Sequence, residues 1–126
     1  MRRIALLICG LALSCGGTAA DPQPGTGTCV TSANVTSPGF YFSFDGGAAQ
    51  NPTVTVCKGT TVTFHVSTSS IHPFCIWNPG DNKSAPGVTN NCISSGDVVW
   101  QIPADFSTGA RYVCNVHFFE GKFAIK

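Results

Sequence analysis

Charged side chains are scarce in this sequence of 126 residues. They make up 10 % of the chain, whereas a globular domain typically carries about 25 %. The few lysines and arginines are scattered, so they offer no basic surface to the phosphates of a nucleic acid, and we expect no nucleic-acid partner. Setting Arg2 and Arg3 aside leaves five of the seven basic residues against six acidic ones. This near balance does not indicate a partner that is recruited by charge.

Methionine, CxxC pairs and helical periodicity are also scarce or missing. Met1 is the only methionine, and the seven cysteines stand at positions 9, 15, 29, 57, 75, 92 and 114 with no CxxC pair. This spacing excludes a zinc ribbon and a thioredoxin-type redox motif. No stretch combines a helical apolar stripe with capping residues. Hydrophobic residues are plentiful, at 43 % of the chain, so the sequence can build a core and is not disordered.

The first residues have the layout of a secretory signal peptide. Arg2 and Arg3 precede an apolar run over residues 4–15, which is too short to cross a bilayer as a helix. Two cleavage sites fit this layout. The favoured one is a bacterial lipobox over residues 12–15 (ALSC), which makes residues 1–14 the signal peptide and Cys15 the lipid-carrying first residue. The alternative is an ordinary site that ends a signal peptide of residues 1–20.

Cleavage at the lipobox leaves residues 15–28 ahead of the folded domain. They are rich in glycine, proline and threonine, and this composition predicts a flexible tether. Residues 29–126 then form one folded domain. We expect the domain outside the cytosol, in the periplasm or cell envelope, where disulfides persist. Membrane contact is expected only through a lipid on Cys15.

Period-two patterns predict strands throughout this domain. Valine alternates with threonine and cysteine over residues 53–57, and apolar and polar residues alternate over residues 61–67. Clusters of glycine, proline and asparagine separate such segments. About seven or eight short strands in about 100 residues predict an all-β domain, a Greek-key β-sandwich that acts as a monomer. The remaining predicted strands cover 98–102, 112–116 and 123–125, together with an early core strand that contains Phe40, Phe42 and Phe44.

A thiol and two imidazoles stand near the ends of two predicted strands. Cys114 and His117 are three residues apart at the end of one strand, and His72 lies in the loop after the strand 61–67. A sandwich brings the ends of successive strands together. A soft thiolate with two imidazoles suits both Cu(I) and Cu(II), and it is the equatorial ligand set of blue-copper centres. We therefore predict one copper ion bound by these three residues.

These residues belong to a longer, ordered set of motifs. The set consists of residues 58–64 (KGTTVTF), 72–74 (HPF), 99–103 (VWQIP) and 112–117 (YVCNVH), followed by Gly121. In this order the motifs resemble the cupredoxin family, the plastocyanin-like small blue copper proteins, over roughly residues 52–126. The resemblance implies a sandwich of about eight strands with copper at one end. It also implies one-electron transfer without substrate chemistry, so we expect no enzymatic activity.

The axial position departs from the pattern of the family. Plastocyanin-like loops end in Gly-Met, and the methionine sulfur is the long axial ligand, whereas the corresponding pair here is Gly121 and Lys122. Lys122 is a poor replacement because a protonated ammonium has no lone pair. Glu120 is either a weak fourth ligand or, as we favour, simply solvated. In the second case the centre has three ligands or adds a backbone oxygen, and it favours Cu(I).

The cysteine count supports a metal-bound thiolate. One cysteine lies in the apolar run of the signal peptide and Cys15 is lipidated or removed, so five cysteines remain in the folded domain. An odd number in an extracytoplasmic fold leaves one thiol over. If Cys114 binds copper, the other four can pair in three ways. The favoured pairing would tie the N-terminal segment to a strand and brace the loop after His72; it joins Cys29 to Cys57 and Cys75 to Cys92.

The predicted partner is another redox protein. The solvent edge of His117 is the expected exit for electrons, within an apolar docking patch made of Pro73, Phe74, Phe118 and Phe119. The alternative is a non-redox module on the same sandwich, either a site for copper or zinc or an interaction domain, because the missing methionine leaves this open. A hydrolase based on Cys114 is disfavoured, since no third group is available to orient its base.

Overall fold

The folded part of the chain consists of strands. The computed structural model describes residues 27–126, and this part of the chain contains nine strands and no helix. The predicted signal peptide, both cleavage sites, Cys15 and most of the predicted tether lie outside the described residues. The strands are β1 (Ser32–Gly39), β2 (Tyr41–Phe44), β3 (Val54–Val56), β4 (Thr61–Ser67), β5 (Phe74–Trp77), β6 (Val88–Thr89), β7 (Ser95–Gln101), β8 (Arg111–Cys114) and β9 (Glu120–Ile125).

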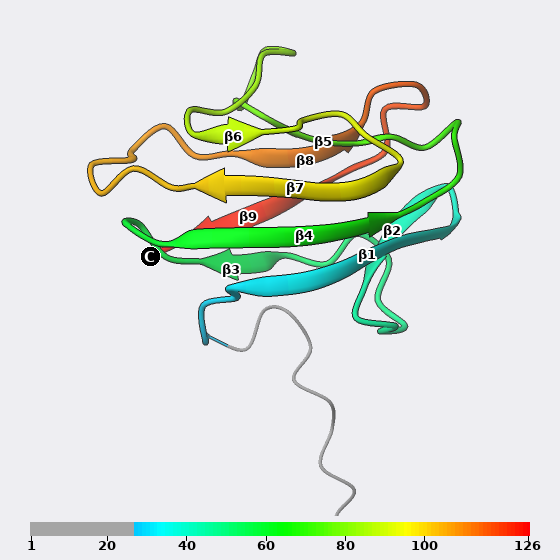
Figure 1. Ribbon diagram of the computed structural model, residues 1–126, viewed down its shortest axis with the longest axis horizontal. Coiled ribbons are helices and arrows are strands. Elements are labelled where there is room, and N and C mark those ends of the chain that lie inside the picture. The colour runs from blue at the N-terminus through cyan, green and yellow to red at the C-terminus, as the bar shows by residue number, and fades with distance from the viewer. Residues whose placement is uncertain (1–26) are drawn as a thin grey trace, which may run out of the picture.

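The strands form two sheets that pack face to face as a sandwich (Figure 1). One sheet has five strands in the order β2-β1-β4-β7-β6, and the other has four in the order β3-β9-β8-β5. Each sheet is mixed, because β1 pairs with β4 and β3 pairs with β9 in parallel while the other pairs are antiparallel. The predicted all-β sandwich is thereby confirmed, and its Greek-key connectivity stays a prediction.

The core lies between the inner faces of the two sheets. Along β4 the residues Val62, Phe64 and Val66 are buried, whereas Thr61, His65 and Ser67 are exposed, as the period-two pattern predicts. Trp100 is fully buried on β7, and its indole N–H donates to the carbonyl of Pro86 at 2.9 Å. The centre of the core is a group of aromatic rings in contact with one another, in edge-on, tilted and stacked pairs, formed by Phe42, Phe44, Phe64, Phe74, Tyr112 and Phe123.

One predicted core residue lies on the surface. Phe42 and Phe44 are buried as expected, but Phe40 is 68 % exposed. The prediction was wrong because Phe40 lies in the turn between β1 and β2 rather than within a strand, so the alternation of the strand does not reach it. The predicted strand 112–116 is also shorter than expected, because its last residues belong to a loop. That strand stops at Cys114, and Val116 is half exposed in the loop that follows.

Both predicted disulfides are present. Cys29 is bonded to Cys57, which joins the N-terminal segment to the end of β3, and Cys75 on β5 is bonded to Cys92 in the connection between β6 and β7. Among residues 27–126, Cys114 is the only cysteine left free, and it is buried. A second, smaller apolar cluster surrounds the Cys75–Cys92 disulfide, where Cys75 packs with Trp77 and Val113. Within the same residues no helix has the length and apolar character of a membrane span.

Candidate metal site

Cys114 is the last residue of β8 and begins the loop to β9. Its backbone N–H donates to the carbonyl of Phe119 at 3.0 Å, and its carbonyl accepts from the N–H of Phe118 at 2.9 Å. These two bonds close a tight loop, and Phe118 adopts the left-handed backbone conformation with φ of 58°. The loop therefore returns at once to β9 and presents His117 beside the thiol that starts it.

His72 comes from the loop between β4 and β5, at the same end of the sandwich (right in Figure 1). Its backbone is held on both sides, since its N–H donates to the carbonyl of Ser69 at 2.8 Å and its carbonyl accepts from the hydroxyl of Thr68 at 2.8 Å. Two neighbouring N–H groups, those of Thr68 and Phe74, donate to the carbonyls of Ser94 and Ile93. The loop is thus anchored to the segment that the Cys75–Cys92 disulfide braces.

The three predicted ligands lie together. The Sγ atom of Cys114 is 3.7 Å from Nδ1 of His72 and 4.0 Å from Nδ1 of His117, and the three candidate ligand atoms all lie within 4.8 Å of one another. With bonds of about 2.3 Å to sulfur and about 2.0 Å to nitrogen, a trigonal metal would separate sulfur and nitrogen by about 3.7–3.8 Å. The two sulfur–nitrogen distances are therefore close to those expected around one metal ion.

The three candidate ligands differ in their burial. Cys114 is fully buried and His72 is nearly so, whereas His117 is exposed. Burial lowers the pKa of His72, and the neighbouring His117 lowers that pKa further. A lowered pKa favours the neutral imidazole, which is the form that binds a metal ion.

A backbone oxygen is the nearest additional donor. The carbonyl oxygen of Ile71 lies 3.1 Å from Nδ1 of His117 and 3.7 Å from Sγ of Cys114. A carbonyl oxygen at this position can approach a metal held by the three side chains. This matches the predicted alternative in which a backbone oxygen, rather than a fourth side chain, completes the site.

Glu120 and Lys122 lie outside the cluster. The carboxylate of Glu120 forms an ion pair with Arg111 on the neighbouring strand β8 and is about half exposed. Arg111 is in turn fixed over the ring of Trp77, 5.5 Å from its centroid. Lys122 is exposed on β9, where the alternation turns it away from the core. The structure thus places the weak fourth ligand that the sequence suggested in a surface ion pair.

Aromatic rings surround the two imidazoles. The ring of Phe40 meets the rings of His72 and His117 edge-on, with centroids 5.4 Å and 5.1 Å apart, and Phe119 lies 5.2 Å from His72. Phe40 therefore reaches the site from the β1–β2 turn, although the sequence placed it in the core. No spacing pattern links Phe40 to residues 72–117, so sequence reasoning had no signal for this contact.

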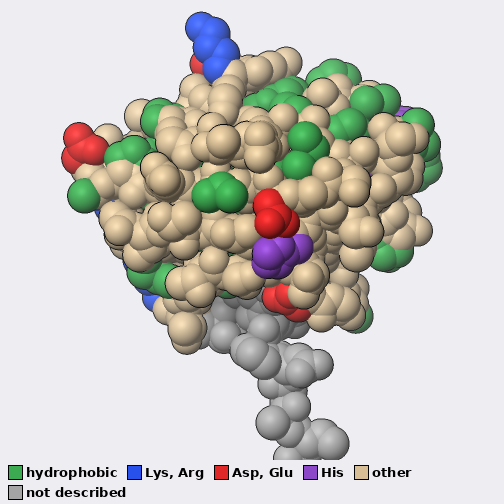
Figure 2. All heavy atoms as spheres, in the orientation of Figure 1, with side chains coloured by type: hydrophobic (Ala, Val, Ile, Leu, Met, Phe, Trp, Pro, Cys, Tyr) green, Lys and Arg blue, Asp and Glu red, His purple; other side chains and the backbone are tan. Residues whose placement is uncertain are grey.

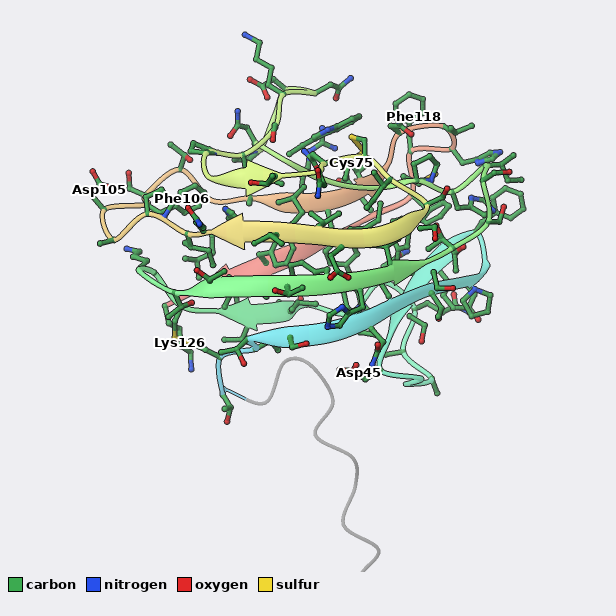
Figure 3. All side chains as sticks on the ribbon, in the orientation of Figure 1. Asp45, Cys75, Asp105, Phe106, Phe118 and Lys126 are labelled. Atoms are coloured by element: carbon green, nitrogen blue, oxygen red, sulfur yellow. A yellow bond between two sulfur atoms is a disulfide. The ribbon has the colours of Figure 1, made fainter. Side chains whose placement is uncertain are left out.

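Exposed apolar side chains form a rim around this end of the molecule. The rim consists of Phe40, Ile71, Val116 and Phe118, which are 68 %, 53 %, 50 % and 63 % exposed. Figure 3 labels Phe118, which projects from the tip of the β8–β9 loop, and hydrophobic atoms gather at this end in Figure 2. The predicted patch needs one correction, because Phe74 is fully buried. It lies on β5, where its ring packs into the core.

A comparison of the chain with models of known protein families, with curated proteins and with solved structures found no match in any of the three. The candidate function therefore depends on the residues of the site and their geometry.

Proposed function

We propose that this protein is an extracytoplasmic copper protein that carries single electrons through His72, Cys114 and His117. The observation that carries the proposal is the meeting of one thiol and two imidazole nitrogens within 4.8 Å, with the thiol left out of both disulfides. One soft and two borderline ligands suit copper in both oxidation states. The motifs that resemble the cupredoxin family contain these same three residues, and this resemblance supports the proposal.

The support around the ligands suits electron transfer. Copper, when bound, supplies a one-electron couple, and a fixed compromise geometry lets the electron pass with little rearrangement. The backbone on each side of His72 and Cys114 is hydrogen-bonded, as described above, and the nearby Cys75–Cys92 disulfide braces the same loops. These constraints hold the ligands in one arrangement before and after the electron passes.

The absence of a fourth side-chain ligand favours Cu(I). The chain has no methionine after Met1, and Glu120 is engaged by Arg111. A centre with three strong ligands, shielded by Phe40 and Phe119, has no carboxylate to stabilise Cu(II). We expect its reduction potential to be higher than that of a centre with an added carboxylate ligand.

The apolar rim is the proposed docking surface for a redox partner. It surrounds His117, the one exposed ligand, which makes this imidazole the shortest exit for an electron. Weak redox complexes use small interfaces. Because the rim residues carry no charge, the association rate should change little with salt, and a steep salt dependence would count against this surface.

The proposed compartment follows from the chemistry of the cysteines. Two disulfides are stable in an oxidising environment, and the sequence over residues 1–20 suggests export with or without a lipid on Cys15. We therefore place the protein in the periplasm or cell envelope.

Copper loading of the purified protein tests the function. We expect an intense visible band from thiolate-to-Cu(II) charge transfer, which disappears on reduction and returns on reoxidation. Cys114→Ser should abolish the band. Glu120→Gln and Lys122→Ala are matched controls that alter neighbouring side chains outside the cluster, and both should retain it.

Two outcomes would contradict the proposal. A protein that stays colourless with copper and binds one zinc ion tightly would be a non-redox metal-binding module, which is the alternative that the sequence left open. A coloured protein that loses its band in Glu120→Gln would show that the carboxylate leaves Arg111 and binds the metal, and the proposed set of three side-chain ligands would be wrong.

A further inference from the structure

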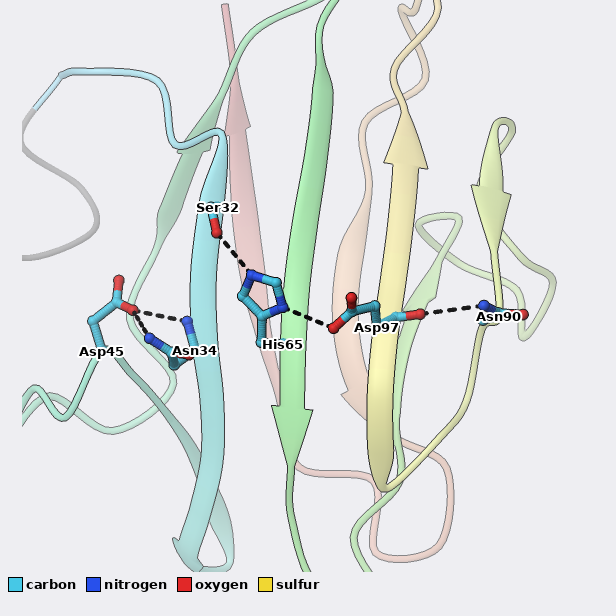
Figure 4. Close-up of polar contacts among 6 residues, drawn as sticks. All are labelled: Ser32, Asn34, Asp45, His65, Asn90 and Asp97. Atoms are coloured by element: carbon cyan, nitrogen blue, oxygen red, sulfur yellow. Dashed lines mark hydrogen bonds and ion pairs between the residues drawn. The ribbon is translucent and has the colours of Figure 1, made fainter.

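A second histidine centre lies on the outward face of the five-stranded sheet. Nε2 of His65 lies 3.1 Å from the hydroxyl oxygen of Ser32, and Nδ1 of His65 lies 2.7 Å from a carboxylate oxygen of Asp97 (Figure 4). The three residues come from the neighbouring strands β1, β4 and β7. None of them belongs to the candidate metal site.

The register of the sheet creates this chain of contacts. His65 is directly opposite Asp97 in the antiparallel β4–β7 pair and opposite Asn34 in the parallel β1–β4 pair. Ser32 precedes Asn34 by two residues and therefore shares its face of the sheet. Diagonal neighbours of this kind lie within reach of a long side chain. The three side chains meet although the first and the last are 65 positions apart in the sequence.

The hydrogen bonds define a role for each group. A carboxylate only accepts, so Nδ1 of His65 carries the proton that Asp97 accepts. In the neutral imidazole Nε2 then has its lone pair free, and it faces the hydroxyl of Ser32. This is the order of nucleophile, base and orienting carboxylate that serine hydrolases use on unrelated folds, where it is recognised by geometry and roles rather than by sequence position.

We propose that Ser32, His65 and Asp97 form an acyl-transfer site that hydrolyses activated esters. Oγ of Ser32 forms a bond to the carbonyl carbon of the ester while its proton passes to Nε2 of His65. The bond to the leaving alcohol or phenol breaks, and His65 returns the proton to that oxygen. Water then attacks the acyl-serine by the same route, which releases a carboxylic acid and restores the hydroxyl. This activity is independent of the proposed copper function and was not expected from the sequence.

The exposure of the site sets its substrate class. The side chains of His65 and Asp97 are 47 % and 55 % exposed, so the centre lies on an open face. General-base catalysis contributes about 10²–10⁴-fold, and one oxyanion donor contributes about 10²–10³-fold where a closed site provides it. An open face can provide general-base catalysis without an oxyanion donor. The expected substrates are therefore small esters with good leaving groups, such as aryl acetates, and turnover should be slow.

Hydrolysis of 4-nitrophenyl acetate tests the proposal. The rate is measured in a Cys114→Ser background, which removes the buried thiol as a competing nucleophile and disables the candidate metal site. We expect Ser32→Ala and His65→Gln each to lower the rate by at least about tenfold. The double variant should be no slower than either single one, because the two residues act as a unit. Ser95→Ala, which alters an exposed serine on β7, is the matched control and should leave the rate unchanged.

A second measurement separates the serine from the imidazole. Mass spectrometry of the protein after brief exposure to the ester should find an acetyl group on Ser32 that Ser32→Ala lacks. A rate that falls in His65→Gln but not in Ser32→Ala would mean that the imidazole acts alone, and the proposal would be wrong. It would also be overturned if every variant kept the parent rate, with the three residues serving only to tie the strands together.

Discussion

Two histidine centres of opposite character share one sandwich. His72 and His117 lie in loops at one end beside a buried thiol and among aromatic rings, whereas His65 lies on a strand of the outward face between a hydroxyl and a carboxylate. The same side chain is thus prepared for a soft metal in one place and for proton transfer in the other. The neighbours of an imidazole, rather than the imidazole itself, therefore decide its chemistry.

Replacing one histidine of each centre should distinguish the two centres most clearly. His72→Ala should weaken copper binding by more than about 100-fold, because removal of a direct ligand costs more than removal of its outer partners. His65→Ala should leave the copper affinity unchanged, since this imidazole faces Asp97 and Ser32. Competitive titration with a chelator measures both affinities. Equal losses in the two variants would show that the centres are coupled.

The disulfides extend the comparison to the scaffold. Replacing either bridge by two alanines should lower the free energy of unfolding by about 2–4 kcal/mol, as measured by urea titration. Only the loss of the Cys75–Cys92 bridge should also weaken copper binding, because this bridge braces the loops that carry His72 and Cys114. The variant that lacks the Cys29–Cys57 bridge is the control, because we expect it to lose a similar amount of stability. A copper affinity that falls equally in both variants would refute the local role.

Gly121 leaves room for the side chain of Tyr112 on the strand that leads to the candidate metal site. A Cβ at this position would clash with the hydroxyl of Tyr112, a fully buried residue two positions before Cys114. Gly121→Ala should lower the free energy of unfolding by about 1–3 kcal/mol, the usual cost of overpacking. Lys122→Ala on the exposed side of the same strand should change it by less than about 0.5 kcal/mol. Thermal unfolding of the two variants checks this, and similar stabilities would mean that Tyr112 moves aside freely.

The smallest effect is expected on the outward face. Asp97→Asn should lower the free energy of unfolding by about 0.2–1 kcal/mol, since its pair with His65 is half exposed and largely screened by water. High salt should shrink this difference further. Urea titration of parent and variant at low and high salt measures it. A loss of several kcal/mol would indicate that the Ser32–His65–Asp97 chain holds the sheet together.

Much of the fold follows from local patterns. Alternation over residues 61–67 predicted β4 with its buried and exposed faces. The odd cysteine count predicted one free thiol, and the neighbouring histidines assigned it to Cys114. Three strands, β1, β5 and β6, were not predicted. The four residues of β5 are all buried, so they show no alternation, and the two of β6 are too few for any period. Burial on both faces erases the signal on which such predictions depend.

Local patterns in the sequence predicted the two ligands that are close along the chain and one unpaired thiol in the folded domain. Cys114 and His117 are three residues apart, and their tight loop follows from local hydrogen bonds. Three other features became visible only in the folded chain: the contact of Phe40 with both imidazoles, the pairing of Glu120 with Arg111, and the line of Ser32, His65 and Asp97. The physical reason is that strand register and loop packing join segments far apart in the chain, and no periodicity within either segment records which partner it will meet.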